Sequence, residues 1–167
     1  MTHNRASGAL WVHTCSRALT THVEWALDRV LPVGDGLPWQ AQSALPGCVR
    51  AHVGWRGPAG AAATIASILG AFDLRFEVTE AAGEDTLGER FAFVPHLGMF
   101  RATVGPMGDV LLGEDRLRAA LAASYDAGAR EMVEEVDRLL GGPWDRELEV
   151  FRAAALGESV RWLSATG

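Results

Sequence analysis

The order of strand-like and helix-like segments in the first eighty residues most constrains the fold of this chain. Residues 48–55 alternate between apolar side chains and polar or small ones, which is the period of a half-buried strand. Further strands are predicted at 8–13, 37–42 and 74–79, and helices at 16–31 and 58–72. The resulting order, β-α-β-β-α-β, is the ferredoxin-like pattern, in which the first strand lies between the third and the fourth.

The second half of the chain predicts an extension of this unit. Short strands at 89–95, 99–105 and 110–112 indicate an antiparallel β-meander. From residue 114 apolar residues recur at helical spacing, and glycines interrupt them, which predicts two to three C-terminal helices; residues 160–163 are expected to form a terminal strand or a packed tail. We therefore expect an α+β sandwich that forms one globular unit, with the sheet and meander in residues 1–112 and a helical extension packed on it in residues 113–167.

Charge and composition exclude several classes of function. The net charge is −6 and the pI about 5.3, which argues against binding to nucleic acid or to an anionic membrane surface. Every basic residue is Arg, so chemistry that needs a Lys is excluded. No apolar run approaches the ~18 residues that would span a bilayer. Without an apolar leader, Cys15 and Cys48 are expected to be free thiols in the cytoplasm.

Several segments of the chain resemble an actinobacterial family catalogued as domain of unknown function 3145. They are His13 with Arg17-Ala18-Leu19, residues 22–25, 55–60, 74–80, 114–118, 143–145 and 160–163. The resemblance implies an actinobacterial cytosolic protein and loosely associates it with type II fatty-acid synthesis loci, and it carries no activity over. Cys15 departs from the family pattern, which has a small non-thiol residue there, and this weakens a role for Cys15 as a nucleophile.

Strand alternation gathers one set of polar and aromatic side chains on the sheet face that points away from the two helices. The set consists of Trp11, His13, Arg50, His52, Arg75 and Glu77. Imidazole, guanidinium and indole groups together suit an anionic or acyl ligand, because paired guanidiniums bind carboxylate or phosphate groups. The same pattern also fits a solvated sheet face, or an ion-pair network covered by the C-terminal helices.

Other sites are weaker candidates. His13, Cys15, His22, Cys48 and His52 are zinc-ligand types, but they lack metal-binding spacing, so we expect neither a metal nor a cofactor. Cys15 with a neighbouring His would be a nucleophile at a helix N-terminus, yet a structural thiol is favoured. The turn at residues 57–60 opens a helix, where backbone N–H groups can hold an anion. An open sheet of this topology also occurs in RNA-binding domains, but the RNA-binding string of basic and aromatic residues is missing.

Together these patterns predict a non-enzymatic accessory or regulatory protein that binds a protein partner or a small anionic or acyl ligand. The alternative is an enzyme in which His13 or His52 acts as acid or base and Arg50 or Arg75 binds an anionic substrate. A third hypothesis is a homodimer formed through the sheet edge or the meander.

Overall fold

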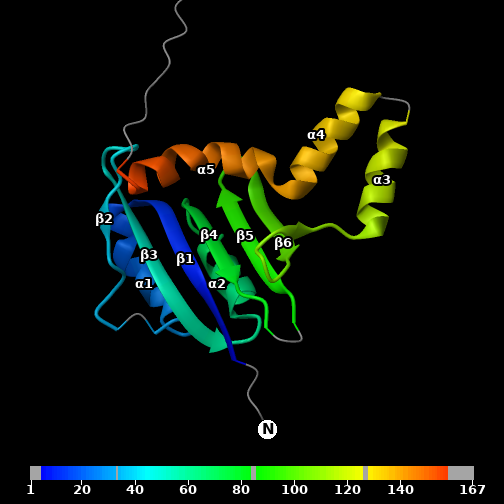
Figure 1. Ribbon diagram of the computed structural model, residues 1–167. Helices are drawn as coiled ribbons and strands as arrows, with labels where there is room; N and C mark the ends of the chain where they lie inside the picture. Colours follow the sequence, from blue (N-terminus) through cyan, green and yellow to red (C-terminus); the bar gives the residue numbers. More distant parts are fainter. Residues whose placement is uncertain (1–4, 33, 84–85, 126–127, 158–167) are drawn as a thin grey trace, which may run out of the picture.

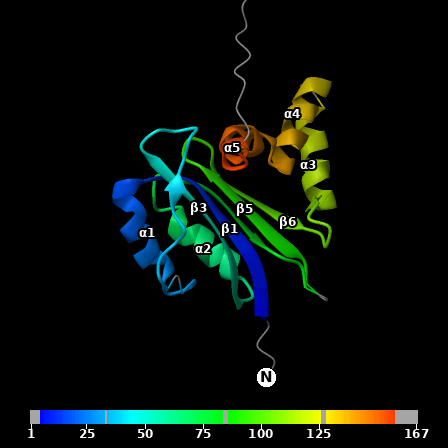
Figure 2. The ribbon, with the colours of Figure 1, turned by 60° about the vertical axis from the view of Figure 1, so that its left-hand side comes forward.

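The protein is built around one antiparallel sheet with helices on both faces. The computed structural model describes residues 5–32, 34–83, 86–125 and 128–157. Figures 1 and 2 show α1 and α2 on one face of the sheet and α5 crossing the other. The helices are α1 (Thr20–Leu27), which a short 3-10 turn (Arg17–Leu19) precedes, α2 (Ala61–Leu69), α3 (Glu114–Ser124), α4 (Ala129–Leu140) and α5 (Gly142–Ala155).

The central strand of the sheet is β1, and its neighbours come from distant parts of the chain. The strands are β1 (Arg5–Ser16), β2 (Gln40–Ala41), β3 (Cys48–Pro58), β4 (Arg75–Glu80), β5 (Gly88–Val94), β6 (Gly98–Val104) and β7 (Val110–Leu111). Their order is β2-β3-β1-β4-β5-β6-β7, and every neighbouring pair is antiparallel. The first strand therefore lies between the third and the fourth, and the strands from β4 to β7 form a meander, as the sequence predicted.

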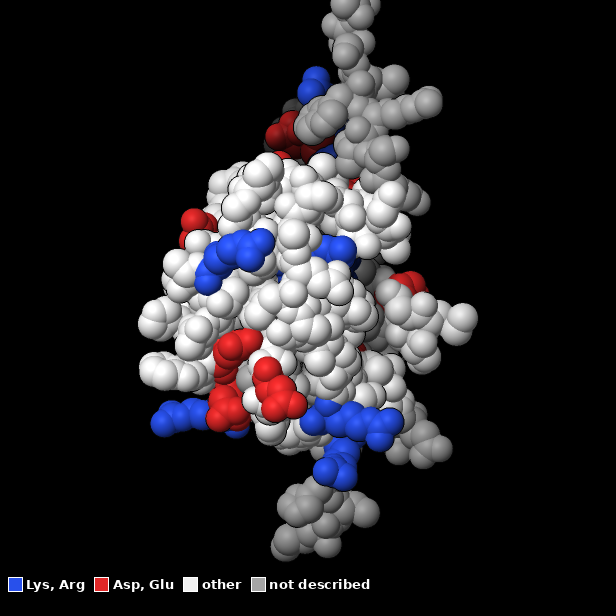
Figure 3. All heavy atoms as spheres, turned by 90° about the vertical axis from the view of Figure 1, so that its left-hand side faces the viewer, with Lys and Arg blue, Asp and Glu red and all other residues white. Residues whose placement is uncertain are grey.

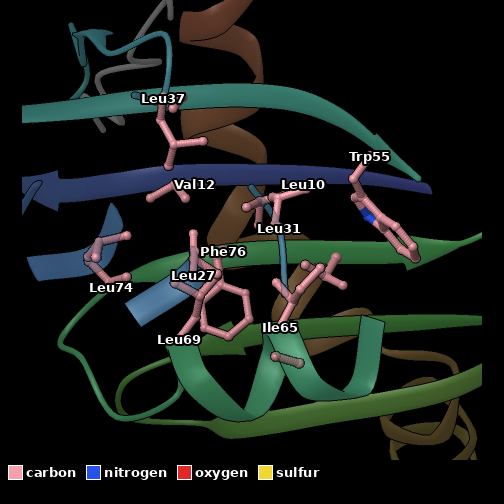
Figure 4. Packing of buried hydrophobic residues seen from close by; sticks show 14 of the residues in the cluster. Leu10, Val12, Leu27, Leu31, Leu37, Trp55, Ile65, Leu69, Leu74 and Phe76 are labelled. Atoms are coloured by element: carbon pink, nitrogen blue, oxygen red, sulfur yellow. The ribbon is translucent and has the colours of Figure 1, made fainter. Parts of the chain in front are cut away.

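The main apolar core lies between the sheet and the helices α1 and α2. Its side chains alternate along the strands, and Figure 4 shows Leu10 and Phe76 pointing toward Ile65 and Leu69 of α2. All four are at most 1% exposed. The small residues of α2 allow this helix to pack close to the sheet. Burial of the apolar side chains on the inward faces of the strands holds α1 and α2 in place.

A smaller apolar cluster fixes α5 on the opposite face. Leu148 is 0% exposed and lies with Trp144 against β5 and β6. The residues that these two strands contribute to the cluster are Ala92, Val94, Phe100 and Ala102. The Trp144 Nε1–H donates to the Gly98 carbonyl at 2.9 Å. The hairpin of α3 and α4 precedes α5 and projects from the body of the molecule in Figure 1. The later turns of α5 lie across β4, β1 and β3 (Figure 1).

Three elements differ most from the expected bounds, and smaller differences occur elsewhere: β3 continues to Pro58, and α2 is limited to Ala61–Leu69. The first strand begins earlier and ends later than residues 8–13, and it contains a bulge near its end. The strand expected at 37–42 shrinks to β2, because Pro38 has no N–H to donate to a ladder. The first helix ends at Leu27, and the chain to Leu31 continues as a turn in which Val30 and Leu31 both donate to the Leu27 carbonyl. The segment 160–163 lies outside the described residues.

Two glycines on neighbouring strands differ in the space around them, which gives a stability prediction. A Cβ added at Gly8 would lie 1.8 Å from the Thr79 carbonyl oxygen and 2.6 Å from the Trp55 ring, whereas one at Gly54 would meet only the Gly8 oxygen, at 3.9 Å. We expect Gly8→Ala to lower the free energy of unfolding by about 1–3 kcal/mol, because backbone must shift. Gly54→Ala is the control and should change it by less than about 1 kcal/mol. Equal urea denaturation midpoints for the two variants would contradict the close approach at Gly8.

Candidate functional site

The six polar and aromatic residues predicted from strand alternation lie on the sheet face that α5 crosses. Trp11 in β1 is directly opposite His52 in β3 and Glu77 in β4. The Trp11 and His52 rings stack with centroids 4.8 Å apart and planes 6° apart. Trp11 is half-buried and His52 exposed, so this stack forms a flat surface that remains partly open to solvent.

His13 lies at a bulge in β1 and contacts Glu77. The register shifts between Val12 and Cys15 against β3, and between Val12 and Thr14 against β4. Buried Gln42 donates from its side-chain amide to the His13 carbonyl at 2.8 Å. This hydrogen bond gives the backbone carbonyl at the bulge a partner. His13 is 5% exposed, and its Nε2 lies 2.8 Å from Glu77 Oε2.

Glu77 is the centre of a charged network between the sheet and α5. Besides His13, it accepts hydrogen bonds from Arg90 Nη2 at 2.9 Å, and from Arg152 Nε and Nη2 at 3.0 and 2.6 Å. Asp145 accepts from the same two guanidiniums. Burial alone would raise the pKa of Glu77, but the hydrogen bonds from His13 and Arg152 and their charges outweigh it and hold this pKa well below its usual value. The network therefore keeps both carboxylates ionised.

Arg50 and Arg75 stand apart from this network. Arg75 lies 5.4 Å from the centroid of the Phe151 ring in α5, and its Nε is buried with no hydrogen-bond partner in the described part of the chain. Arg50 donates from Nε to the Ala41 carbonyl and from Nη1 to the Ala155 carbonyl, both at 3.4 Å. No carboxylate of the described residues lies within ion-pair distance of either guanidinium. Two positive charges on this face thus lack a negative partner there.

Two cavities open on either side of Trp11. The larger measures about 520 Å³ and lies between β1, β3 and the C-terminal end of α5; Trp11, Pro38, Arg50, His52, Ala155 and Leu156 are among its lining residues. We call it the Arg50 pocket. The smaller, of about 480 Å³, lies over the network of Glu77, Arg90, Asp145 and Arg152. Because the protein's own ion pairs occupy the charged groups of the second cavity, the Arg50 pocket is the better candidate for a ligand.

Sequence patterns did not identify three members of the network. Arg90 on β5, and Asp145 and Arg152 on α5, complete the charged set. Arg90 lies on the same face of β5 as Ala92, which packs against α5. Strand alternation extended to residues 88–94 predicts this position. No local pattern assigned α5 to this face, so the roles of Asp145 and Arg152 depend on tertiary packing alone.

The weaker candidates have structural roles. Cys15 is 1% exposed, and burial, with contributions from Cys48 and Glu24, raises the pKa of its thiol to about 11. A buried thiol of this pKa is a poor nucleophile. At the turn that opens α2, the Gly60 N–H donates to the carboxylate of Glu80 at 2.9 Å and the Ala62 N–H at 3.2 Å. An internal carboxylate therefore holds the position where an external anion was considered.

Metal-binding and membrane-spanning features are missing from the described part of the chain, and a broad basic patch is missing from the face that Figure 3 shows. In residues 5–157, apart from the three short gaps, no three His, Cys, Asp or Glu side chains group as metal ligands would. Within the same part of the chain, no helix has the length and apolarity to cross a membrane. On the face formed by α1 and the β2–β3 edge, basic and acidic side chains are interspersed among uncharged ones and form no broad basic patch (Figure 3).

Comparison with known proteins gives one match. The family model described as protein of unknown function (DUF3145) matches residues 9–165. No curated protein and no solved structure matches the chain.

Proposed function

The chain belongs to the family of proteins of unknown function called DUF3145, and we propose that it is an accessory or regulatory protein of the cytoplasm that binds a small anionic ligand with an apolar body. The ligand lies in the Arg50 pocket, with its anionic group at Arg50 and its apolar body against Trp11 and Leu156. Acyl carboxylates are one class of such ligands, and they agree with the loose association of the family with fatty-acid synthesis.

The observation that carries this proposal is the combination of an apolar wall with the guanidinium of Arg50, which has no carboxylate partner among the described residues. A volume of about 520 Å³ falls within the range of roughly 300–1,000 Å³ that is usual for small-molecule sites. Pro38, Ala155 and Leu156 supply apolar surface, and Arg50 supplies the charge. In a protein of net charge −6, a guanidinium that has no carboxylate partner among the described residues favours an anionic ligand.

The contacts of the two histidines favour binding over catalysis. His13 is buried and bonded to Glu77, which in turn binds two guanidiniums, so this imidazole is poorly placed to exchange a proton with a ligand. His52 is exposed at the rim of the pocket and stacks on Trp11. If the protein is instead an enzyme, His52 is the histidine better placed to act as acid or base on a ligand in the Arg50 pocket, and its replacement by Ala would abolish turnover rather than reduce affinity.

We also propose that residues 5–80 form a ferredoxin-like unit. The order β2-β3-β1-β4, with β1 at the centre and every pair antiparallel, supports it. So does the position of α1 and α2 on one face of the sheet in Figure 2.

Octanoate and octyl phosphate are suitable probes for the proposed function. We expect at least one of them to bind saturably in isothermal titration calorimetry and to change the protein's tryptophan fluorescence. Trp11→Ala should weaken this binding about tenfold, because the indole forms one wall of the pocket. The control is Trp25→Ala, since Trp25 is 74% exposed on α1, on the opposite face. Absence of saturable binding by both probes, or an equal effect of the two substitutions, would contradict the proposal.

A further inference from the structure

We propose that the Arg50 pocket selects a singly charged carboxylate over a phosphate, and that Arg50 is the residue that binds the carboxylate. This inference rests on the proposed ligand-binding function and names the ligand class. It depends on the hydrogen-bond donors that remain available in the pocket, on the net charge of the pocket, and on the helix end that forms one wall.

Only one of the two guanidiniums that line the Arg50 pocket is available. Arg152 directs Nε and Nη2 to Glu77, shares Nη2 with Asp145, and lies with Nη1 3.5 Å from Glu149. Arg50 donates only to backbone carbonyls at 3.4 Å, which is beyond the usual range of strong hydrogen bonds. Its Nη2 has no partner among the described residues. Arg50 can therefore offer one pair of N–H groups, which matches the two oxygens of a carboxylate.

The charge of the surroundings matches a single negative charge. Arg90 and Arg152 are balanced by Glu77 and Asp145 within the network. Arg50 is then the one unbalanced positive charge among the described residues that line the pocket. A phosphate monoester carries a charge of about −1.5 to −2 near neutral pH and has three strongly accepting oxygens, which a single guanidinium does not satisfy.

The C-terminal end of α5 adds a second, independent reason. Phosphate sites commonly use backbone N–H groups at helix N-termini, whereas Ala155 and Leu156 present the opposite end of a 14-residue helix to this pocket. The carbonyls there carry partial negative charge. Because this repulsion grows with the charge of the ligand, a dianion is disfavoured more than a monoanion. The ligand class that fits is a monocarboxylic acid with a hydrocarbon or aromatic body.

The selectivity can be tested with two probes that share one tail. We expect calorimetry at near-neutral pH and constant ionic strength to give an affinity for octanoate about tenfold or more above that for octyl phosphate. Arg50→Gln should lower the octanoate affinity about tenfold and remove the preference. Arg56→Gln is the matched control, because Arg56 is exposed on the same strand, outside the residues that line the pocket, and should leave both affinities unchanged.

Each outcome decides between the two proposals. Octyl phosphate binding as tightly as octanoate, or better, would overturn the carboxylate inference and leave the proposed function standing. An Arg50→Gln variant that has the melting temperature of the Arg56→Gln variant and unchanged octanoate affinity would also overturn it. Saturable binding of neither probe would overturn the proposed function, and the inference with it.

Discussion

Replacement of Glu77 by Gln is expected to lower the free energy of unfolding by about 3 kcal/mol. The amide keeps the volume of the side chain but removes the charge that His13, Arg90 and Arg152 contact. Breaking a buried ion pair by removing one partner costs about 3–5 kcal/mol. The low end applies here because Asp145 still pairs with both guanidiniums. Urea denaturation of the two proteins measures the difference directly.

Glu134→Gln provides the matched control for this measurement. Glu134 pairs with Arg130 on α4, but the two side chains are 60% and 90% exposed. Exposed ion pairs contribute about 0–1 kcal/mol because water screens them. A loss in Glu77→Gln no larger than that in Glu134→Gln would show that the Glu77 network does not stabilise the folded state.

The pH dependence of stability provides a second measure of the same network. The pKa of Glu77 is lower in the folded protein than its ordinary value of 4.5, so the unfolded chain takes up a proton first as the pH falls. The stabilisation by Glu77 is therefore complete above about pH 4.5 and is lost progressively below it. Glu77→Gln should show a shallower decline under acid conditions. Some decline should remain, because hydrogen bonds from Arg90 and Arg152 also outweigh burial and lower the pKa of Asp145.

The strand order and the two sheet faces could be predicted because they depend on local patterns. Alternation in residues 48–55 and 74–79 determines which side chains face the helices, and Ala51 and Phe76 are buried as that pattern requires. The same alternation also places the six site residues on one face. Parity describes a regular strand, however, and nothing in the pattern of β1 predicted the bulge after Val12 that allows both Val12 and Cys15 to enter the core.

The position of α5 could not be predicted, and it determines what the candidate site is. The helical spacing of apolar residues after residue 114 predicts helices but does not say which surface the last of them covers. In Figure 1, α5 lies across the upper part of the open face, and there Asp145 and Arg152 form ion pairs with Arg90 and Glu77. It leaves the Arg50 pocket beside its C-terminal end. The face therefore carries an ion-pair network in one part and an accessible pocket in the other.

Leu148→Ala is expected to lower the free energy of unfolding by about 2–5 kcal/mol, because it leaves a cavity in the cluster that holds α5 on the sheet. Leu148 is 0% exposed and contacts a compact set of residues from β5, β6 and α5. Leu121→Ala is the control: it removes the same side chain from α3, where Leu121 is 56% exposed, and should cost less than about 0.5 kcal/mol beyond any change in helix propensity.

The same pair of variants tests whether α5 forms one wall of the binding site. Arg152, Ala155 and Leu156 reach the Arg50 pocket only while the helix is docked. Leu148→Ala should therefore weaken octanoate binding as well as stability and increase amide hydrogen exchange along α5, whereas Leu121→Ala should change neither. If Leu148→Ala destabilised the protein no more than Leu121→Ala, the apolar cluster would not be what holds α5. The charged contacts from Asp145 and Arg152 would then have to account for its position.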